Sequence, residues 1–214
     1  MQTRRDFLRT SLLSAGGLMI GGMSLDSSLY AKSKKANGII KVGVIGFSDR
    51  ARGSLIPCFQ AHAKELGFEI VAVSDIWSRR REEAKEYFKK NYNQDVKLFR
   101  NNDELYDSKM CDAVIIATAD FQHATHLAQS VKAGLDAYCE KPFAETMEDG
   151  RMALKAVKKS GKVVQIGSQR RSAPNYQAAA EYIKSGKFGP ITMVEMCWNV
   201  NQPGRWRRPA LVAE

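Results

Sequence analysis

The feature that most constrains the fold is a regular alternation of short apolar runs with longer amphipathic segments between residues 39 and 166. The run Asp112–Thr118 (DAVIIAT) has the continuous apolar character of a strand that is buried on both faces. The charged segment Ser78–Tyr92 has the periodicity of a helix. Strands and helices that alternate in this way form a parallel sheet covered on both faces. We therefore predict an α/β fold with a doubly wound parallel (Rossmann) sheet in the order 3-2-1-4-5-6.

The predicted elements follow directly from this alternation. Strands are expected over Ile39–Gly46, Phe68–Ser74, Val96–Phe99, Asp112–Thr118, Asp136–Cys139 and Lys162–Ile166. Helices are expected over Arg52–Leu66, Ser78–Tyr92, Asn102–Tyr106, Gln122–Ala133 and Thr146–Ser160.

The regular alternation of strand and helix patterns ends after Ile166. A helix over Asn175–Lys184 is followed by a long run of strand-forming residues, Ile191–Val200. A single strand beyond a complete parallel sheet is poorly stabilised by itself. We therefore expect residues 168–214 to begin an α+β domain for substrate binding or oligomerisation that is truncated here.

The N-terminus carries an export pattern. Arg4 and Arg5 lie in the motif T-R-R-D-F-L, and the mildly apolar run Leu12–Leu25 contains several glycines. That run is too short and too rich in glycine for a membrane span, which needs ~20 apolar residues. We predict a twin-arginine signal over residues 1–31, a linker over 32–38, and export to the periplasm by the twin-arginine machinery. An uncleaved anchor or a chance Arg pair is the alternative. Because that route carries folded proteins, the cofactor would be loaded in the cytoplasm.

The composition narrows the possible partners. The formal net charge is +10, but no nucleic-acid-binding motif accompanies it, and solvated helix faces or anionic ligands explain it more simply. We expect no nucleic-acid partner. The four cysteines form no C-x-x-C motif, so buried free thiols are expected. The three histidines have no metal-site spacing, and no metal is expected.

The first strand ends in a loop that resembles a phosphate-binding turn. Gly46 can make the tight turn, and Ser48 stands where a dinucleotide-binding loop has its middle glycine. Ser48 is small enough for a pyrophosphate to approach, and its hydroxyl could donate a hydrogen bond. Arg50 or Arg52 could add positive charge. An ordinary strand-to-helix turn is the alternative.

A carboxylate follows the second strand. Asp75 stands where the adenosine ribose hydroxyls of a bound dinucleotide would lie. A carboxylate there favours NAD over NADP, because it repels a 2′-phosphate, although Arg79 and Arg80 nearby could reverse this preference. A cap or turn residue is the alternative interpretation of Asp75.

The tripeptide Glu140-Lys141-Pro142 ends the fifth strand. Proline fixes φ and lacks an N–H, so the exit of the chain is constrained there. Ligands of open parallel sheets bind at the carboxyl ends of the strands. A lysine held at that edge can donate a proton or polarise a hydroxyl, and partial burial would help it to lose its proton.

Together these motifs, with Val164-Gln165-Ile166-Gly167 before Arg170-Arg171, resemble the Gfo/Idh/MocA oxidoreductase family over about Ile40–Trp198. The family acts mainly on sugars and cyclitols. The resemblance implies an NAD(P)-binding domain over residues 39–167. It also implies hydride transfer to or from a secondary hydroxyl of a carbohydrate-like substrate, with NAD as cofactor and NADP as the alternative. We expect a homo-oligomer for the full-length protein.

The resemblance also assigns roles to site residues. Lys141 would contact the reacting hydroxyl and the nicotinamide ribose, and Glu140 would orient Lys141 and the cofactor. Thr118 and His123 would line the nicotinamide side. Gln169 or Arg170 would line the substrate mouth. Without the resemblance, His123 would be interpreted as a helix N-terminal histidine satisfied by backbone groups.

Family enzymes usually draw a catalytic histidine from the second domain, and the last histidine here is His126. We therefore expect a fragment that is inactive by itself. Two alternative functions remain open. One is an NAD-using glycosidase of the same superfamily, which oxidises its substrate transiently, eliminates the glycosidic bond and regenerates the cofactor. The other is a redox-silent protein that binds a sugar or a nucleotide.

Overall fold

The computed structural model describes residues 38–197. The predicted export signal, the linker apart from Gly38, and the chain from Trp198 onward lie outside the described residues. The chain divides into two compact units, one ending at Arg170 and the other beginning at Arg171.

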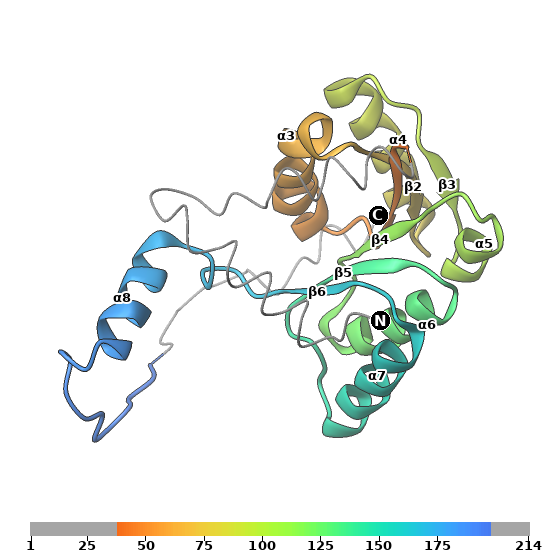
Figure 1. The fold of residues 1–214 in the computed structure, drawn as a ribbon. Helices are drawn as coiled ribbons and strands as arrows, with labels where there is room; N and C mark the ends of the chain where they lie inside the picture. Colours follow the sequence, from red (N-terminus) through yellow and green to blue (C-terminus); the bar gives the residue numbers. More distant parts are fainter. Residues whose placement is uncertain (1–37, 198–214) are drawn as a thin grey trace. The chain divides into compact units, whose positions relative to one another are not determined.

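The first unit contains a six-stranded parallel sheet in the order β3-β2-β1-β4-β5-β6 (Figure 1). Its strands are β1 (Ile40–Ile45), β2 (Phe68–Ser74), β3 (Lys97–Phe99), β4 (Ala113–Ile116), β5 (Asp136–Glu140) and β6 (Val164–Gly167). The predicted strand order is confirmed. The order reverses between β1 and β4, where ligands of such sheets bind beyond the carboxyl ends.

The helices of this unit connect successive strands. They are α3 (Ile56–Leu66), α4 (Ser78–Tyr92), α5 (Asn102–Asp107), α6 (His123–Lys132) and α7 (Met147–Ser160), with a 3₁₀ turn η3 (Asp120–Gln122) before α6. The predicted helix from Arg52 begins instead with a π-helical segment, η2 (Ala51–Leu55), in which the Ile56 N–H bonds to the Ala51 carbonyl. Pro57 follows and has no N–H to offer the preceding turn, which accounts for the altered hydrogen bonding.

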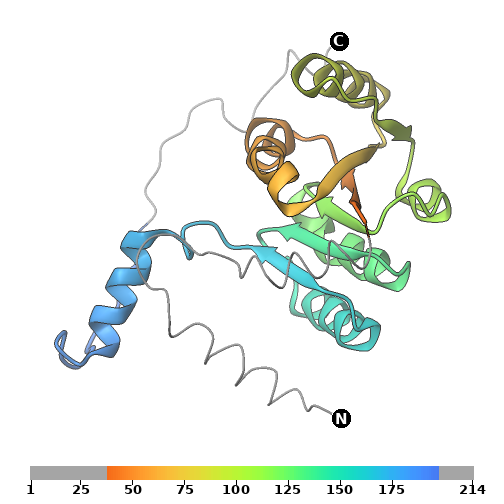
Figure 2. The same cartoon turned by 45° about the horizontal axis from the view of Figure 1, so that its top comes forward.

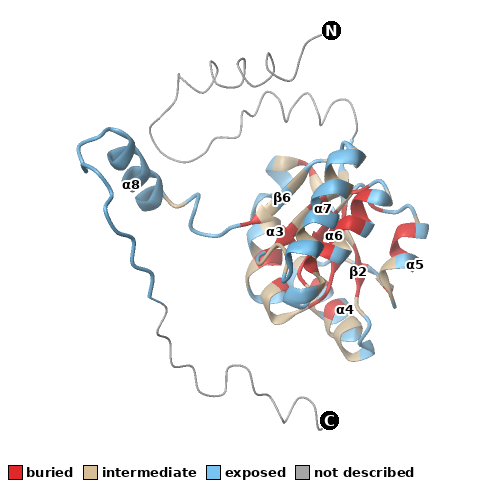
Figure 3. Ribbon diagram, turned by 90° about the horizontal axis from the view of Figure 1, so that it is seen from below, coloured by how far each residue is buried: buried red, intermediate tan, exposed pale blue. Residues whose placement is uncertain are grey.

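Helices cover both faces of the sheet. On one face α3 and α4 enclose a core that includes Phe47, Ile56 and Phe88, all without exposed surface. On the other face α5, α6 and α7 enclose Ile116, Leu127 and their neighbours (Figures 1 and 2). Figure 3 shows the buried residues gathered between the helices and the sheet. Burying a large apolar side chain stabilises a fold by ~1.5–3 kcal/mol, so these two layers supply the main driving force.

The second unit contains α8 (Pro174–Lys184), where Tyr182 makes an edge-on contact with Phe188 at 6.3 Å between ring centroids. The predicted strand over Ile191–Val200 is wrong for residues 191–197, which have no regular secondary structure, and the remainder lies outside the described residues. A strand needs a neighbour for its backbone hydrogen bonds. The described residues of this unit provide none.

All four cysteines are free thiols, as predicted, but only Cys111 and Cys139 are buried. Cys58 and Cys197 are exposed, which corrects the expectation of uniform burial. Burial raises the pKa of Cys111 to about 11 and that of Cys139 to about 12. Among residues 38–197, no helix is long and apolar enough to cross a membrane.

Candidate active site

The glycine turn at the end of β1 has room only for glycine. Gly46 has a φ of +86°, and its N–H donates to the Ser74 carbonyl oxygen at 2.8 Å. A Cβ at this position would lie 2.8 Å from Thr118 Cγ2 and 3.0 Å from the Ala117 carbonyl oxygen. Both the backbone conformation and the close approach to the end of β4 therefore require a residue without a side chain.

Ser48, in the next part of this loop, is hydrogen-bonded to Ala117, the residue after β4. Its hydroxyl donates to the Ala117 carbonyl oxygen at 2.7 Å and accepts the Ala51 N–H at 3.2 Å. The single O–H of Ser48 is therefore directed at Ala117, the residue after β4, and not toward a phosphate. A helical segment starts at Asp49, directly after this turn, and the N-terminus of a helix in that position is where dinucleotide folds bind phosphate.

Asp75 lies beside the glycine turn. Its Oδ2 accepts the Phe47 N–H, and its Oδ1 accepts the Trp77 N–H, both at 2.9 Å. A carboxylate has about four lone-pair positions, so it can accept ribose hydroxyls in addition to these two bonds. The structure thus brings Asp75 to the loop that follows β1, as its predicted role requires.

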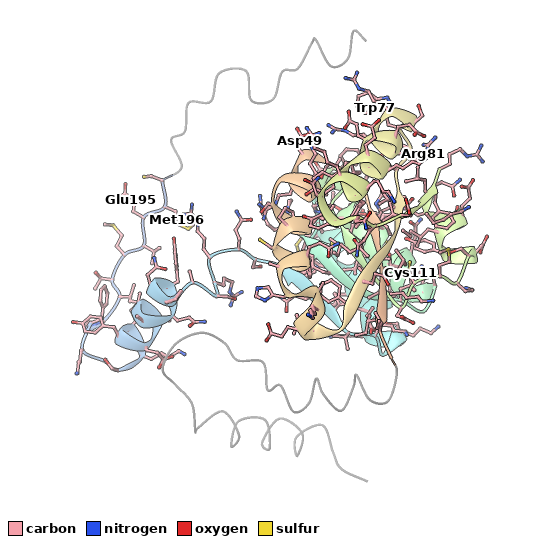
Figure 4. All side chains as sticks on the ribbon, turned by 90° about the horizontal axis from the view of Figure 1, so that it is seen from above. Asp49, Trp77, Arg81, Cys111, Glu195 and Met196 are labelled. Atoms are coloured by element: carbon pink, nitrogen blue, oxygen red, sulfur yellow. The ribbon has the colours of Figure 1, made fainter. Side chains whose placement is uncertain are left out.

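The side chains of Arg79 and Arg80, which follow Asp75 in the sequence, form ion pairs with acidic neighbours. Arg80 donates to Asp49 Oδ1 at 3.0 Å and to Glu83 Oε2 at 2.8 Å. Arg79 pairs with Glu83 at 3.4 Å, and both guanidinium groups lie over the Trp77 ring, 5.8 and 5.7 Å from its centroid. Asp49, Trp77 and Arg81 are marked in Figure 4. A 2′-phosphate would have to compete with these contacts.

At the end of β5, Glu140 is 2% exposed and forms an ion pair with Arg50, the last residue of the segment 46–50 that follows β1 and is here called the glycine loop. Arg50 Nε donates to Glu140 Oε1 at 2.7 Å, and Glu140 Oε2 accepts the Lys141 N–H at 2.8 Å. Arg50 Nη2 also donates to Gln169 Oε1 at 3.1 Å. Four of the predicted site residues, Arg50, Glu140, Lys141 and Gln169, therefore lie together at the carboxyl edge of the sheet.

Lys141 itself is exposed. Its ammonium group makes no hydrogen bond or ion pair with any described residue, and its peptide bond to Pro142 is cis. Lys141 lies on the same rim as the glycine turn, because Glu140 beside it contacts Arg50 of that loop. The described residues do not provide the partial burial expected for this lysine, because the chain leaves β5 at the exposed carboxyl edge of the sheet.

His123 is buried at the start of α6. Its Nδ1 lies 2.8 Å from the Pro142 carbonyl oxygen, and its Nε2 lies 3.2 Å from the Thr118 carbonyl oxygen. The imidazole therefore joins the end of β4 to the segment after β5. The structure places His123 as a backbone-bonded helix N-terminal residue, the interpretation that the sequence favours without the family resemblance.

Thr118 has a partner that the sequence did not single out. Its hydroxyl lies 3.2 Å from His126 Nδ1. Burial, and secondarily the nearby His123, lower the pKa of His126, so the neutral imidazole is favoured. The only available sequence signal was that His126 follows His123 by one helical turn, which places the two on one side of a helix.

Arg170 is exposed and has a φ of +72°. It makes no hydrogen bond or ion pair with the described residues and is not brought to Lys141 by any contact. Among the described residues, no cluster of three or more histidine, cysteine or acidic side chains could hold a metal ion.

Residues 40–168 match the model of the GFO_IDH_MocA oxidoreductase family, which has an NAD-binding Rossmann fold. The chain belongs to this family. As a Gfo/Idh/MocA protein it is 30% identical over 179 residues to inositol 2-dehydrogenase of Salmonella typhimurium, an alignment that covers 83% of this chain and 50% of that protein. The chain spans about half the length of the curated relatives it matches.

Solved structures agree on the fold. An oxidoreductase from Thermotoga maritima superposes with a TM-score of 0.63 at 27% identity, covering 71% of this chain and 44% of that one. The WlbA dehydrogenase of Bordetella pertussis, solved with NADH and UDP-GlcNAcA, gives a TM-score of 0.62 at 23% identity, with 71% and 43% covered.

Proposed function

We propose that the protein is an NAD-dependent oxidoreductase that transfers hydride to or from a secondary hydroxyl of a cyclitol or sugar-like substrate. The observation that carries this proposal is the Arg50–Glu140 ion pair, which joins the glycine loop to the residue directly before Lys141. The similarity to inositol 2-dehydrogenase supports a cyclitol-type substrate.

The residues at the carboxyl edge fit a dinucleotide. The Gly46 turn excludes any Cβ, the helical segment from Asp49 presents its N-terminus, and Asp75 stands beside the turn. NAD would supply the hydride acceptor or donor. Asp75 would bind the adenosine ribose, and the engagement of Arg79 and Arg80 with acidic partners supports a preference for NAD over NADP.

Lys141 would accept or donate the proton of the substrate hydroxyl. Oxidation of an alcohol removes that proton, reduction returns it, and a positioned group that carries it contributes ~10²–10⁴-fold in rate. Glu140 accepts the backbone N–H of Lys141 and so fixes the direction in which the chain leaves β5. The remaining walls of the substrate cavity are assigned to the domain that we propose to begin at residue 168, after an NAD-binding domain over 39–167.

Replacing Lys141 tests this proposal on the full-length protein. Lys141→Ala should lower kcat by ~10²–10⁴-fold while NADH binding, followed by fluorescence titration, is retained. Lys155→Ala removes the same group from the exposed face of α7 and should leave both measurements unchanged.

Three results would contradict the proposal. Full retention of activity in Lys141→Ala would contradict the proton-transfer role assigned to Lys141. Ligand binding by the wild-type protein without any turnover would identify a redox-silent binding protein. Release of a glycoside product without net NADH would identify an NAD-using glycosidase.

We further propose that the protein is exported to the periplasm by the twin-arginine machinery, with its cofactor loaded in the cytoplasm, and that it assembles as a homo-oligomer. The Arg4-Arg5 motif supports export. A route that carries folded proteins would allow a bound nicotinamide cofactor to cross with the chain.

A further inference from the structure

All three nitrogens of the Arg50 guanidinium lie within hydrogen-bond distance of acceptors, and two of its three partners, Glu140 and Gln169, are 90 and 119 positions away in sequence. Nε and Nη2 face Glu140 Oε1 at 2.7 and 2.6 Å, Nη1 donates to Ser54 Oγ at 3.1 Å, and Nη2 donates to Gln169 Oε1 at 3.1 Å. The side chain therefore reaches from the loop after β1 to the ends of β5 and β6. A rigid, planar fork is suited to holding several acceptors at once.

The two ends of the ion pair differ in exposure. The Glu140 side chain is 3% exposed, whereas that of Arg50 is 40% exposed. A buried carboxylate needs a partner, because an unpaired buried charge is strongly unfavourable. Its second oxygen holds the Lys141 N–H, so a change in the Glu140 orientation is transmitted to the start of the Lys141 segment.

We infer that Arg50 is a positioning residue that couples the glycine loop to Lys141 through Glu140, and that it is not the pyrophosphate-binding cation of this loop. The inference rests on the proposed function, because it assigns Lys141 to the reaction. The two roles predict different kinetic effects when Arg50 is replaced. A phosphate-binding arginine contributes to cofactor affinity, whereas a positioning arginine contributes to the chemical step through the geometry of another residue.

The test compares Arg50→Gln, Arg50→Lys and the control Arg151→Gln, which makes the same chemical change on the exposed face of α7. In the full-length protein, Arg50→Gln should lower kcat by about 10²-fold, the loss typical of a misplaced reacting group, with the NADH dissociation constant near that of the wild type. Arg50→Lys keeps the charge without the fork and should recover part of kcat. Arg151→Gln should change neither quantity.

A weakened NADH affinity with kcat retained would overturn the inference and would assign Arg50 to phosphate binding. Unchanged kinetics would also overturn it.

A stability cycle provides a readout that does not depend on turnover. If Arg50 serves Glu140, then Arg50→Gln should lower the melting temperature, and adding Glu140→Gln should restore part of that loss because the buried charge is removed. Additive effects on the melting temperature would show that the two residues are not coupled and would contradict the inference.

Failure of the proposed function would look different. A wild-type protein that binds NADH and shows this coupling, but oxidises no cyclitol or sugar, would contradict the proposed function. The coupling of the glycine loop to Glu140 would still hold.

Discussion

The backbone N–H of Phe47 donates to the Asp75 carboxylate at 2.9 Å, so the turn that follows β1 and the end of β2 are held by one side chain. The same carboxylate also accepts the Trp77 N–H. Asp75, which we propose to bind ribose, therefore also holds the shape of the loop that follows β1.

Replacing Asp75 by Asn tests the proposed ribose role. A hydrogen bond to a charged group is worth ~1.5–3 kcal/mol, so NADH affinity should fall by about 10- to 100-fold. NADPH affinity should fall less, because the repulsion of a 2′-phosphate is removed at the same time. Titrating both cofactors measures the ratio, and Asp95→Asn on an exposed site is the control. An unchanged preference would argue against Asp75 as the ribose ligand.

Gly46 lies in the turn after β1, whereas Gly53 lies in the π-helical segment η2, and the two should respond differently to replacement by alanine. Gly46→Ala meets a left-handed backbone and a contact of 2.8 Å, and should cost ~2–4 kcal/mol in the free energy of unfolding. Gly53→Ala meets nothing within 4 Å in a helical segment and should be neutral or up to ~1 kcal/mol stabilising. Urea denaturation of both variants measures the difference. Equal losses would mean that the turn at Gly46 relaxes freely.

The lowered pKa of His126 predicts a loss of stability in mild acid. Below the unfolded-state pKa of about 6.5, the unfolded chain takes up a proton more readily than the folded one, so the free energy of unfolding falls as the pH falls through this range. His126→Asn leaves a side chain that does not titrate and should flatten the dependence. His62→Asn, on an exposed histidine, should keep it. An unaltered pH profile in His126→Asn would exclude His126 as its source.

The export proposal is tested at its paired arginines. Replacing Arg4 and Arg5 together by Lys should leave the folded protein in the cytoplasm, because the twin-arginine route depends on that pair. Cell fractionation with antibody detection measures the distribution. Continued appearance of the variant in the periplasm would require a different route.

The sheet order could be predicted because the β-strands carry apolar runs such as Asp112–Thr118, and such runs leave few alternative arrangements. Asp75 could be placed because it directly follows a strand whose end had to meet the glycine turn. Local sequence was sufficient in both cases.

The side-chain network could not be predicted in the same way. Arg50 and Glu140 are 90 positions apart, and their contact depends on how far one side chain reaches across two strand ends. The bond between Thr118 and His126 likewise depends on the packing of α6 against β4. The strand expected beyond Ile191 failed because strand-forming residues need a neighbour that the local sequence does not reveal.

The two core cysteines have a consequence for a protein that is proposed to change compartments. With pKa values of about 11 and 12, the sulfur atoms of Cys111 and Cys139 stay protonated at neutral pH, and only the deprotonated form reacts with oxidants. These two sulfur atoms should therefore be as inert outside the cytoplasm as inside it. The interior of the nucleotide-binding unit can pass from reducing to oxidising surroundings without a covalent change at either position.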